Sequence, residues 1–187
     1  MMLELHNIKI GELIHDLSSW ADGGRMVTVT GAKGCGKTTL LRSVMGLLPI
    51  DGGHISIDGE LLTPLSAPYF RRQMAYVPQH LSAIEGYDGM CYLSEVLFTL
   101  RVNSGSTAFR LPDDNRRLSE LTPDEQYLLL LNNALQLGRP MLIVDEPQMP
   151  LTEETEAVVD EMLTSASERG ITVFAVNSRI TENQIRL

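Results

Sequence analysis

The chain has 187 residues, a mass of 20.7 kDa and 43% hydrophobic residues, enough for one globular domain with its own core. A formal net charge of −9 and a pI of about 4.9 disfavour a broad nucleic-acid surface, so no nucleic-acid partner is expected. The two cysteines, Cys35 and Cys91, are too few for a disulfide framework and suit a reducing cytoplasm, and neither a signal peptide nor a membrane-spanning run is recognised.

The first part of the chain predicts strands around a glycine-rich loop. Residues 3–10 (LELHNIKI) alternate loosely and predict a strand, and residues 25–31 (RMVTVTG) predict a buried strand. A helix follows the loop, with apolar residues on one face as far as Leu48, and Pro49 is expected to end it. Residues 54–57 (HISI) lie between glycine turns and predict a short strand.

The rest of the chain alternates helices with apolar strands. Residues 92–102 predict a helix and residues 103–115 an exposed loop. Residues 140–147 (PMLIVDEP) and 171–177 (ITVFAVN) predict buried strands, and residues 152–169 predict a helix with glutamates in its first turn. This alternation predicts an α/β fold: a mainly parallel central sheet flanked by helices, with antiparallel strands at the N-terminus.

One further helix has clear signals at both ends. Thr122 is its predicted N-cap, Pro123 its first residue, and Glu125 completes a capping box with Thr122. Gly138 is expected to close its C-terminus.

The loop GAKGCGKT, from Gly31 to Thr38, fits the pattern G-x-x-x-x-G-K-[ST] between a strand and a helix. Glycines let successive backbone N–H groups point inward at an anion, and the start of the helix adds a positive dipole end. Lys37 is expected to reach the β- and γ-phosphates of a nucleotide, and the Thr38 hydroxyl to bind Mg²⁺. The predicted nucleotide-binding residues are Gly31, Gly34, Cys35, Gly36, Lys37, Thr38 and Thr39.

Some residues keep two interpretations. Cys35 is either a small residue whose N–H matters more than its sulfur, or a thiol whose oxidation blocks nucleotide binding. The pairs Arg71–Arg72 and Arg116–Arg117 are either solvated surface charge or part of a local basic groove.

Two carboxylates follow the apolar run MLIV. Asp145, at the carboxyl end of a predicted central strand, is placed to hold Mg²⁺ beside the phosphate loop. Glu146 is placed to polarise a water molecule for attack on the γ-phosphorus.

These segments together resemble the ATP-binding cassette family over nearly the whole chain. VTGAKGCGKTTLLRSVMGLL is similar to its Walker A segment, GGHISIDG to the following strand, MLIVDEP to its Walker B strand, and LTPDEQYLLLLNNAL lies where its signature helix is expected. MAYVPQH is similar to the Q-loop, which makes Gln79 a metal and water contact that senses the γ-phosphate. The resemblance implies a single P-loop NTPase domain over residues 1–187 with a reduced helical lobe at about 80–135.

In that family two cassettes close on two ATP molecules, each signature helix completes the partner's site, and closure drives a membrane subunit or another attached machine. The resemblance therefore implies ATP and Mg²⁺ as cofactors, a second cassette as a homo- or heterodimeric partner, and a membrane permease. It predicts catalytic roles for Glu146, Gln79 and Lys37, and metal contacts by Thr38, Gln79 and Asp145.

Several positions depart from the family pattern. The signature LSGGQ is replaced by residues 121–125 (LTPDE), where Pro123 lacks an N–H and Asp124 adds negative charge. Ser178 stands where the switch histidine is expected, QMPL replaces the usual loop after the Walker B strand, and Trp20 lies too late to be the usual adenine-stacking aromatic. The residues that bind the nucleotide within one chain match the family: the phosphate loop, Gln79, Asp145 and Glu146. The residues that would complete the partner's site depart from it.

The resulting expectation is an ATP-binding subunit of a transporter that hydrolyses ATP slowly on its own, located in the cytoplasm or held at the inner membrane by a partner. The lobe from Gln79 to Leu118 is the expected docking surface. The alternatives are a non-catalytic regulatory nucleotide-binding module and a non-transport cassette acting on nucleic acid or protein. A nucleoside kinase is disfavoured because no acceptor-site motif is evident.

Overall fold

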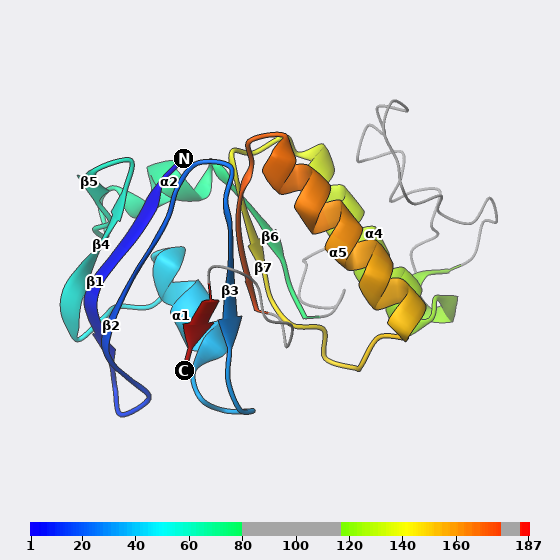
Figure 1. The fold of residues 1–187 in the computed structure, drawn as a ribbon, viewed down its shortest axis with the longest axis horizontal. Helices are drawn as coiled ribbons and strands as arrows, with labels where there is room; N and C mark the ends of the chain where they lie inside the picture. Colours follow the sequence, from blue (N-terminus) through cyan, green and yellow to red (C-terminus); the bar gives the residue numbers. More distant parts are fainter. Residues whose placement is uncertain (80–116, 177–183) are drawn as a thin grey trace.

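Two sheets of different kinds lie on either side of helix α1 (Figure 1). The computed structural model describes residues 1–79, 117–176 and 184–187, so the predicted helix over 92–102 and the loop over 103–115 lie outside the described residues. The antiparallel sheet has the strand order β2-β1-β4-β5. Its strands are β1 (Leu3–Ile10), β2 (Ile14–Ala21), β4 (Gly52–Ile57) and β5 (Glu60–Leu61).

The second sheet carries the candidate site. Its strands in the described residues run in the order β6-β7-β8-β3-β9, and each neighbouring pair is parallel. They are β3 (Met26–Thr30), β6 (Met74–Val77), β7 (Met141–Val144), β8 (Thr172–Val176) and β9 (Gln184–Arg186). The predicted parallel sheet and the antiparallel first strands are both confirmed.

Helices cover both faces of the parallel sheet. Helix α1 (Lys37–Val44) lies between the two sheets, whereas α4 (Pro123–Gln136) and α5 (Glu153–Glu168) lie side by side on the far face (Figure 1). The short elements α2 (Ala67–Arg71) and the 3₁₀ turn η2 (Leu118–Glu120) complete the described part. In that part of the chain, no helix has the length and apolar character needed to cross a membrane.

The parallel sheet separates two hydrophobic cores, because successive strand residues face opposite sides. In β7, Met141 and Ile143 face the core shared with α1 and the antiparallel sheet. Leu142 and Val144 face the core shared with α4 and α5. A strand that is buried on both faces reads as a continuous apolar run, which is why MLIV was recognisable in the sequence.

The ends of the helices test the sequence predictions in detail. The capping box of Thr122 and Glu125 is present at the start of α4, so that prediction is confirmed. The prediction that Pro49 ends α1 is wrong, because the helix stops at Val44. Gly46 takes a left-handed conformation (φ +64°), and the N–H of Leu47 donates to the carbonyl of Arg42 at 2.8 Å. This hydrogen bond belongs to a Schellman motif, which closes the helix before the proline is reached.

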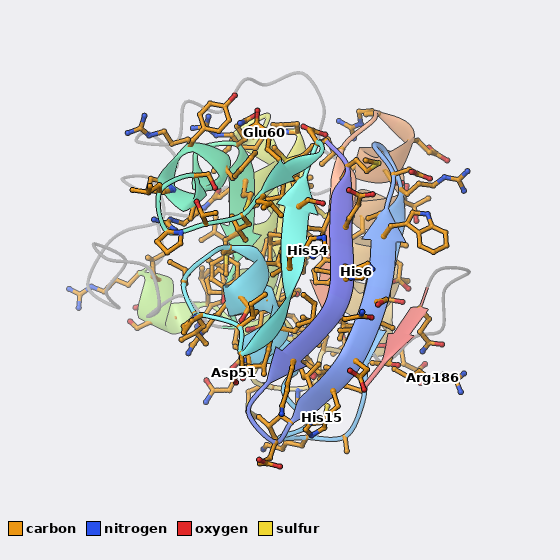
Figure 2. The ribbon with its side chains drawn as sticks, turned by 90° about the vertical axis from the view of Figure 1, so that its left-hand side faces the viewer. His6, His15, Asp51, His54, Glu60 and Arg186 are labelled. Carbon is orange, nitrogen blue, oxygen red and sulfur yellow. The ribbon has the colours of Figure 1, made fainter. Side chains whose placement is uncertain are left out.

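The outer face of the antiparallel sheet is polar. His6 on β1 and His54 on β4 are directly opposed, and their rings stack with centroids 4.9 Å apart (Figure 2). Their sequence neighbours Leu5 and Ile55 point the other way, into the core beside α1. This alternation fixes the register of the two strands, because a one-residue slip would expose the apolar side chains.

Candidate functional site

The glycine-rich loop connects the carboxyl end of β3 to the first turn of α1. Gly36 is the N-cap of α1 and has φ +104°, a conformation that side-chain-bearing residues rarely adopt. A Cβ at this position would lie 3.3 Å from the Cβ of Leu13, in the turn between β1 and β2. The loop therefore needs glycine here for both its backbone conformation and its close approach to that turn.

A cavity of about 720 Å³ opens beside this loop. Its lining includes most of the predicted nucleotide-binding residues: Gly31, Gly34, Gly36, Lys37, Thr38 and Thr39. Gln79 and Glu146 also line it, from the ends of β6 and β7. Cys35 is half-buried and is not among the described lining residues, and a Cβ at Gly31 would lie 2.6 Å from its sulfur. Cys35 thus packs against the base of the loop.

The Lys37 side chain folds back over the loop. Its Nζ donates to the carbonyls of Gly31 at 2.8 Å and Ala32 at 3.1 Å. The same Nζ lies 3.6 Å from a carboxylate oxygen of Glu146. The ammonium group therefore bridges the phosphate loop and the end of β7, and three hydrogens allow it to turn toward an anion in the cavity.

The three predicted metal contacts form one hydrogen-bonded cluster. The Thr38 hydroxyl donates to Oδ1 of Asp145 at 3.1 Å and accepts from Nε2 of Gln79 at 3.2 Å. Asp145 is 1% exposed, and its Oδ1 also accepts from the N–H of Glu146 at 3.0 Å. A hydroxyl, an amide and a carboxylate thus converge from the ends of α1, β6 and β7.

This donor set fits Mg²⁺, which prefers oxygen ligands and is commonly held by one or two carboxylates together with substrate phosphates. The hydroxyl of Thr38 and the carboxylate of Asp145 supply such oxygens, and the Gln79 amide, whose Nε2 faces Thr38 in this structure, would supply its oxygen after a turn of the amide group. The cavity volume also falls in the range of ligand pockets, roughly 300–1,000 Å³.

Two tyrosines that were not predicted lie against Asp145. Tyr76 on β6 donates to Oδ2 of Asp145 at 3.4 Å, and Tyr127 on α4 donates to its backbone carbonyl at 2.8 Å. Burial and the Asp145 carboxylate raise the pKa of Tyr76 to about 12. Burial, with the charges of Asp145 and Glu146, also raises the pKa of Tyr127 above its ordinary value. Both phenols therefore remain protonated donors at neutral pH.

A sequence signal for Tyr127 did exist. It is the only aromatic residue in the run YLLLLNNAL, and a buried tyrosine usually finds a partner for its hydroxyl. The identity of that partner depends on how α4 packs on β7, which the local sequence does not encode.

Asp124 has partners within its own chain. Its Oδ2 accepts from the Thr152 N–H at 3.3 Å, from the Thr152 hydroxyl at 2.6 Å and from the Thr155 hydroxyl at 2.9 Å. Partial burial opposes ionisation of this carboxyl, but the hydrogen bonds outweigh it and lower the pKa of Asp124. The carboxylate joins the first turn of α4 to the N-cap of α5.

The cavity extends beyond the predicted residues. The loop after β7 contributes Gln148, Pro150 and Leu151, and α5 contributes Val159 and Leu163. Leu13 lines the cavity from the turn between β1 and β2 and is 52% exposed. These residues carry no motif, so only the tertiary fold identifies them.

Other sequence interpretations fall elsewhere. Ser178 lies outside the described residues, as do residues 80–116 of the expected docking surface, the lobe from Gln79 to Leu118. Trp20 lies on β2 and is 65% exposed, and it is not among the described residues that line the cavity.

Comparisons with known proteins assign the chain to a family. A family model described as ABC transporter matches residues 14–149. The phosphonates import ATP-binding protein PhnC of Trichormus variabilis is 28% identical over 201 residues, covering 94% of this chain and 82% of that protein. The energy-dependent translational throttle protein EttA of Escherichia coli is 31% identical over 166 residues, covering 87% of this chain but 30% of that protein.

Solved structures agree on the fold. The dimeric structure of an ATP-binding cassette in a post-hydrolysis state, bound to ADP and Pi, matches with a TM-score of 0.74. The two chains are 21% identical, and the match covers 99% of this chain and 94% of the other. At this level of identity the match supports a common fold.

Proposed function

The chain belongs to the ABC transporter family as an ATP-binding cassette, and we propose that it binds Mg-ATP at the loop between β3 and α1 and hydrolyses it slowly on its own. The observation that carries the proposal is the hydrogen-bonded cluster of Thr38, Gln79 and Asp145 beside Lys37. Lys37, Thr38 and Gln79 line one cavity, and the buried carboxylate of Asp145 lies next to it in hydrogen-bond contact with Thr38, which supports binding of phosphate and a metal ion together.

Each residue has a proposed role. The N–H groups of the loop from Gly31 to Thr39 and the Lys37 ammonium bind the phosphates. Thr38, Gln79 and Asp145 hold Mg²⁺, whose charge offsets that of the phosphate oxygens. Glu146 accepts a proton from the attacking water. The exposed fraction of its side chain, 47%, leaves it accessible to such a water.

Slow turnover follows from the first turn of α4. Pro123 has no N–H to offer to a phosphate, and the carboxylate of Asp124 is engaged with Thr152 and Thr155. Losing such contacts typically costs about a hundredfold in rate. A homodimer would lack these contacts at both of its sites and hydrolyse ATP slowly, whereas a different partner cassette with an intact signature would supply them to the site on this chain.

The proposed setting is a single domain over residues 1–187 with a reduced helical lobe at about 80–135, acting in the cytoplasm and held at the inner membrane by a permease. The likeness to a phosphonates import ATP-binding protein over 94% of the chain supports this setting. A membrane permease and a second cassette are therefore the proposed partners.

One observation favours a second candidate function. The relative with 31% identity is named as a translational throttle protein, so a non-transport cassette acting on another macromolecule is the main alternative. The net charge of −9 disfavours direct nucleic-acid binding, which leaves protein partners. Recovery of a membrane permease with the tagged chain supports the transporter role, whereas recovery of only soluble assemblies supports the alternative.

Isothermal titration calorimetry with ATP and Mg²⁺ tests the binding proposal. We expect saturable binding by the wild type and at least about a hundredfold weaker binding by Lys37→Ala, because a desolvated point charge on the phosphates is lost. Lys9→Ala, an exposed lysine on β1, is the matched control and should bind like the wild type. Absence of binding by well-folded wild type, or equal affinity of Lys37→Ala, would refute the proposal.

A further inference from the structure

Helix α4 contacts two functional segments at once. Asp124 in its first turn accepts hydrogen bonds from Thr152 and Thr155 at the start of α5. One turn later, Tyr127 donates to the backbone carbonyl of Asp145 at the end of β7. The helix is thereby joined by directional contacts to the residue that carries the candidate metal-binding carboxylate.

The contact between Tyr127 and Asp145 is well buried. Tyr127 is 4% exposed, and its hydroxyl lies 2.8 Å from the carbonyl oxygen. Strand β7 ends at Val144, so the carbonyl of Asp145 lies beyond the described ladder, and the phenol supplies it with a donor. A buried carbonyl that loses its donor is costly, so the contact restrains the orientation of this peptide.

That peptide carries both candidate carboxylates. It joins Asp145 to Glu146, and the Glu146 N–H donates to Oδ1 of Asp145 at 3.0 Å. The same Oδ1 accepts from Thr38 at 3.1 Å. A rotation of the peptide would move the Asp145 carboxylate away from Thr38 and shift the start of the Glu146 side chain.

We propose that Tyr127 is a positioning residue, which orients the peptide between Asp145 and Glu146 so that the cluster with Thr38 can bind a divalent cation. The inference rests on the proposed function and goes beyond it, because it gives a residue outside the phosphate loop and the acidic strand end a role in metal-dependent nucleotide binding. Tyr127 also lines the cavity, but the role proposed for it acts through its hydrogen bond to Asp145.

Calorimetric titration with ATP in Mg²⁺ and again in EDTA separates positioning from general stability. Tyr127→Phe keeps the ring and removes only the hydroxyl. We expect its ATP affinity to fall about tenfold in Mg²⁺ and to stay within about twofold of the wild type in EDTA. Tyr69→Phe, on α2 with 61% of the side chain exposed, is the matched control and should change neither value.

The outcomes are distinct. Equal losses in Mg²⁺ and in EDTA indicate a packing role and overturn the inference, as does unchanged affinity in both. Wild type that binds no ATP in either condition overturns the proposed function, and the inference with it. If the wild type binds ATP and Tyr127→Phe binds it with the same affinities, the inference fails but the proposed function stands.

A second measurement covers the case in which Tyr127→Phe does not fold. Wild type labelled with 3-fluorotyrosine gives one ¹⁹F resonance for each of its five tyrosines. Replacing each of the other four tyrosines by phenylalanine, one at a time, identifies their resonances, and the remaining resonance belongs to Tyr127. Adding Mg²⁺ to the ATP complex should shift the Tyr127 resonance and leave that of Tyr69 in place. A Tyr127 resonance that does not respond to Mg²⁺ contradicts the inference.

Discussion

The Thr38 hydroxyl lies 3.1 Å from Oδ1 of Asp145, although the two residues are 107 positions apart in the sequence. Thr38 follows β3 and Asp145 follows β7, and these two strands are separated in the sheet by β8. The contact therefore spans the carboxyl edge of the sheet, where ligands bind in open α/β sheets.

Thr38→Val should weaken Mg-ATP binding about tenfold while leaving metal-free ATP binding near the wild-type value. The substitution keeps the shape of the side chain but removes the hydroxyl that contacts both Asp145 and Gln79. Calorimetry in Mg²⁺ and in EDTA measures both affinities. Thr63→Val, in the loop before α2, is the control and should bind ATP like the wild type. If the ATP affinity of Thr38→Val depended on Mg²⁺ as that of the wild type does, Thr38 would have no role in metal binding.

Glu146→Gln should retain ATP but lose at least about a hundredfold in single-turnover hydrolysis, because an amide cannot act as a general base. Its carboxylate lies 3.6 Å from Lys37, so the substitution also frees that ammonium group for phosphate. Rapid-quench measurement of phosphate release, at protein in excess over ATP, gives the rate.

Glu153→Gln, exposed in the first turn of α5, is the matched control for the Glu146 variant and should hydrolyse ATP like the wild type. Hydrolysis by Glu146→Gln at the wild-type rate would instead favour a non-catalytic nucleotide-binding module.

Asp124→Ala should lower the free energy of unfolding by about 1 kcal/mol at neutral pH, a modest value because the carboxyl is partly exposed and screened. It removes the acceptor for Thr152 and Thr155. Because folding lowers the pKa of Asp124, its contribution is present above the ordinary carboxyl pKa and is lost as the pH falls through the folded value.

Urea unfolding of Asp124→Ala and wild type at neutral pH, and again below about pH 4, should therefore show the difference shrinking in acid. Glu161→Ala, exposed on α5, serves as the control and should differ from wild type by less than about 0.5 kcal/mol. A difference that grows in acid would contradict the assignment.

Gly36→Ala should destabilise the protein more than Gly138→Ala. Both glycines have positive φ, +104° and +60°; the backbone penalty for alanine is about 1 kcal/mol at Gly138 and larger at Gly36, whose φ lies well beyond the left-handed minimum. Only at Gly36 does the added Cβ meet a close neighbour, 3.3 Å from the Cβ of Leu13, whereas Gly138 has open space. Urea unfolding of the two variants measures the combined cost of the backbone conformation and the contact at Gly36, and equal losses would contradict the prediction.

Structural features that depend on residues close together in the sequence were the most predictable. Thr122, Pro123 and Glu125 encode the start of α4 through one turn of backbone, and the structure contains the predicted capping box. The prediction that α1 ends at Pro49 is wrong because Gly46, which lies inside the apolar pattern that runs to Leu48, closes the helix earlier.

Contacts between elements that are distant in the sequence could not be predicted from sequence patterns. The motif identified Lys37, Thr38 and Asp145, but their mutual distances depend on the strand order of the sheet. Tyr76 and Tyr127 were missed because a phenol gains its role from what packs against it. Asp124 was interpreted as a charge facing a partner, and the hydrogen bonds to Thr152 and Thr155 arise only when α4 and α5 lie side by side.

The single tryptophan of the chain, Trp20, belongs to the antiparallel sheet, which packs on one of the two cores, while α4 and α5 pack on the other. Fluorescence emission thus samples the melting of one half of the molecule, and far-ultraviolet circular dichroism is weighted toward the helices of the other half. Coincident denaturation curves from the two spectroscopies would mean that the central sheet makes both cores melt as a single cooperative unit.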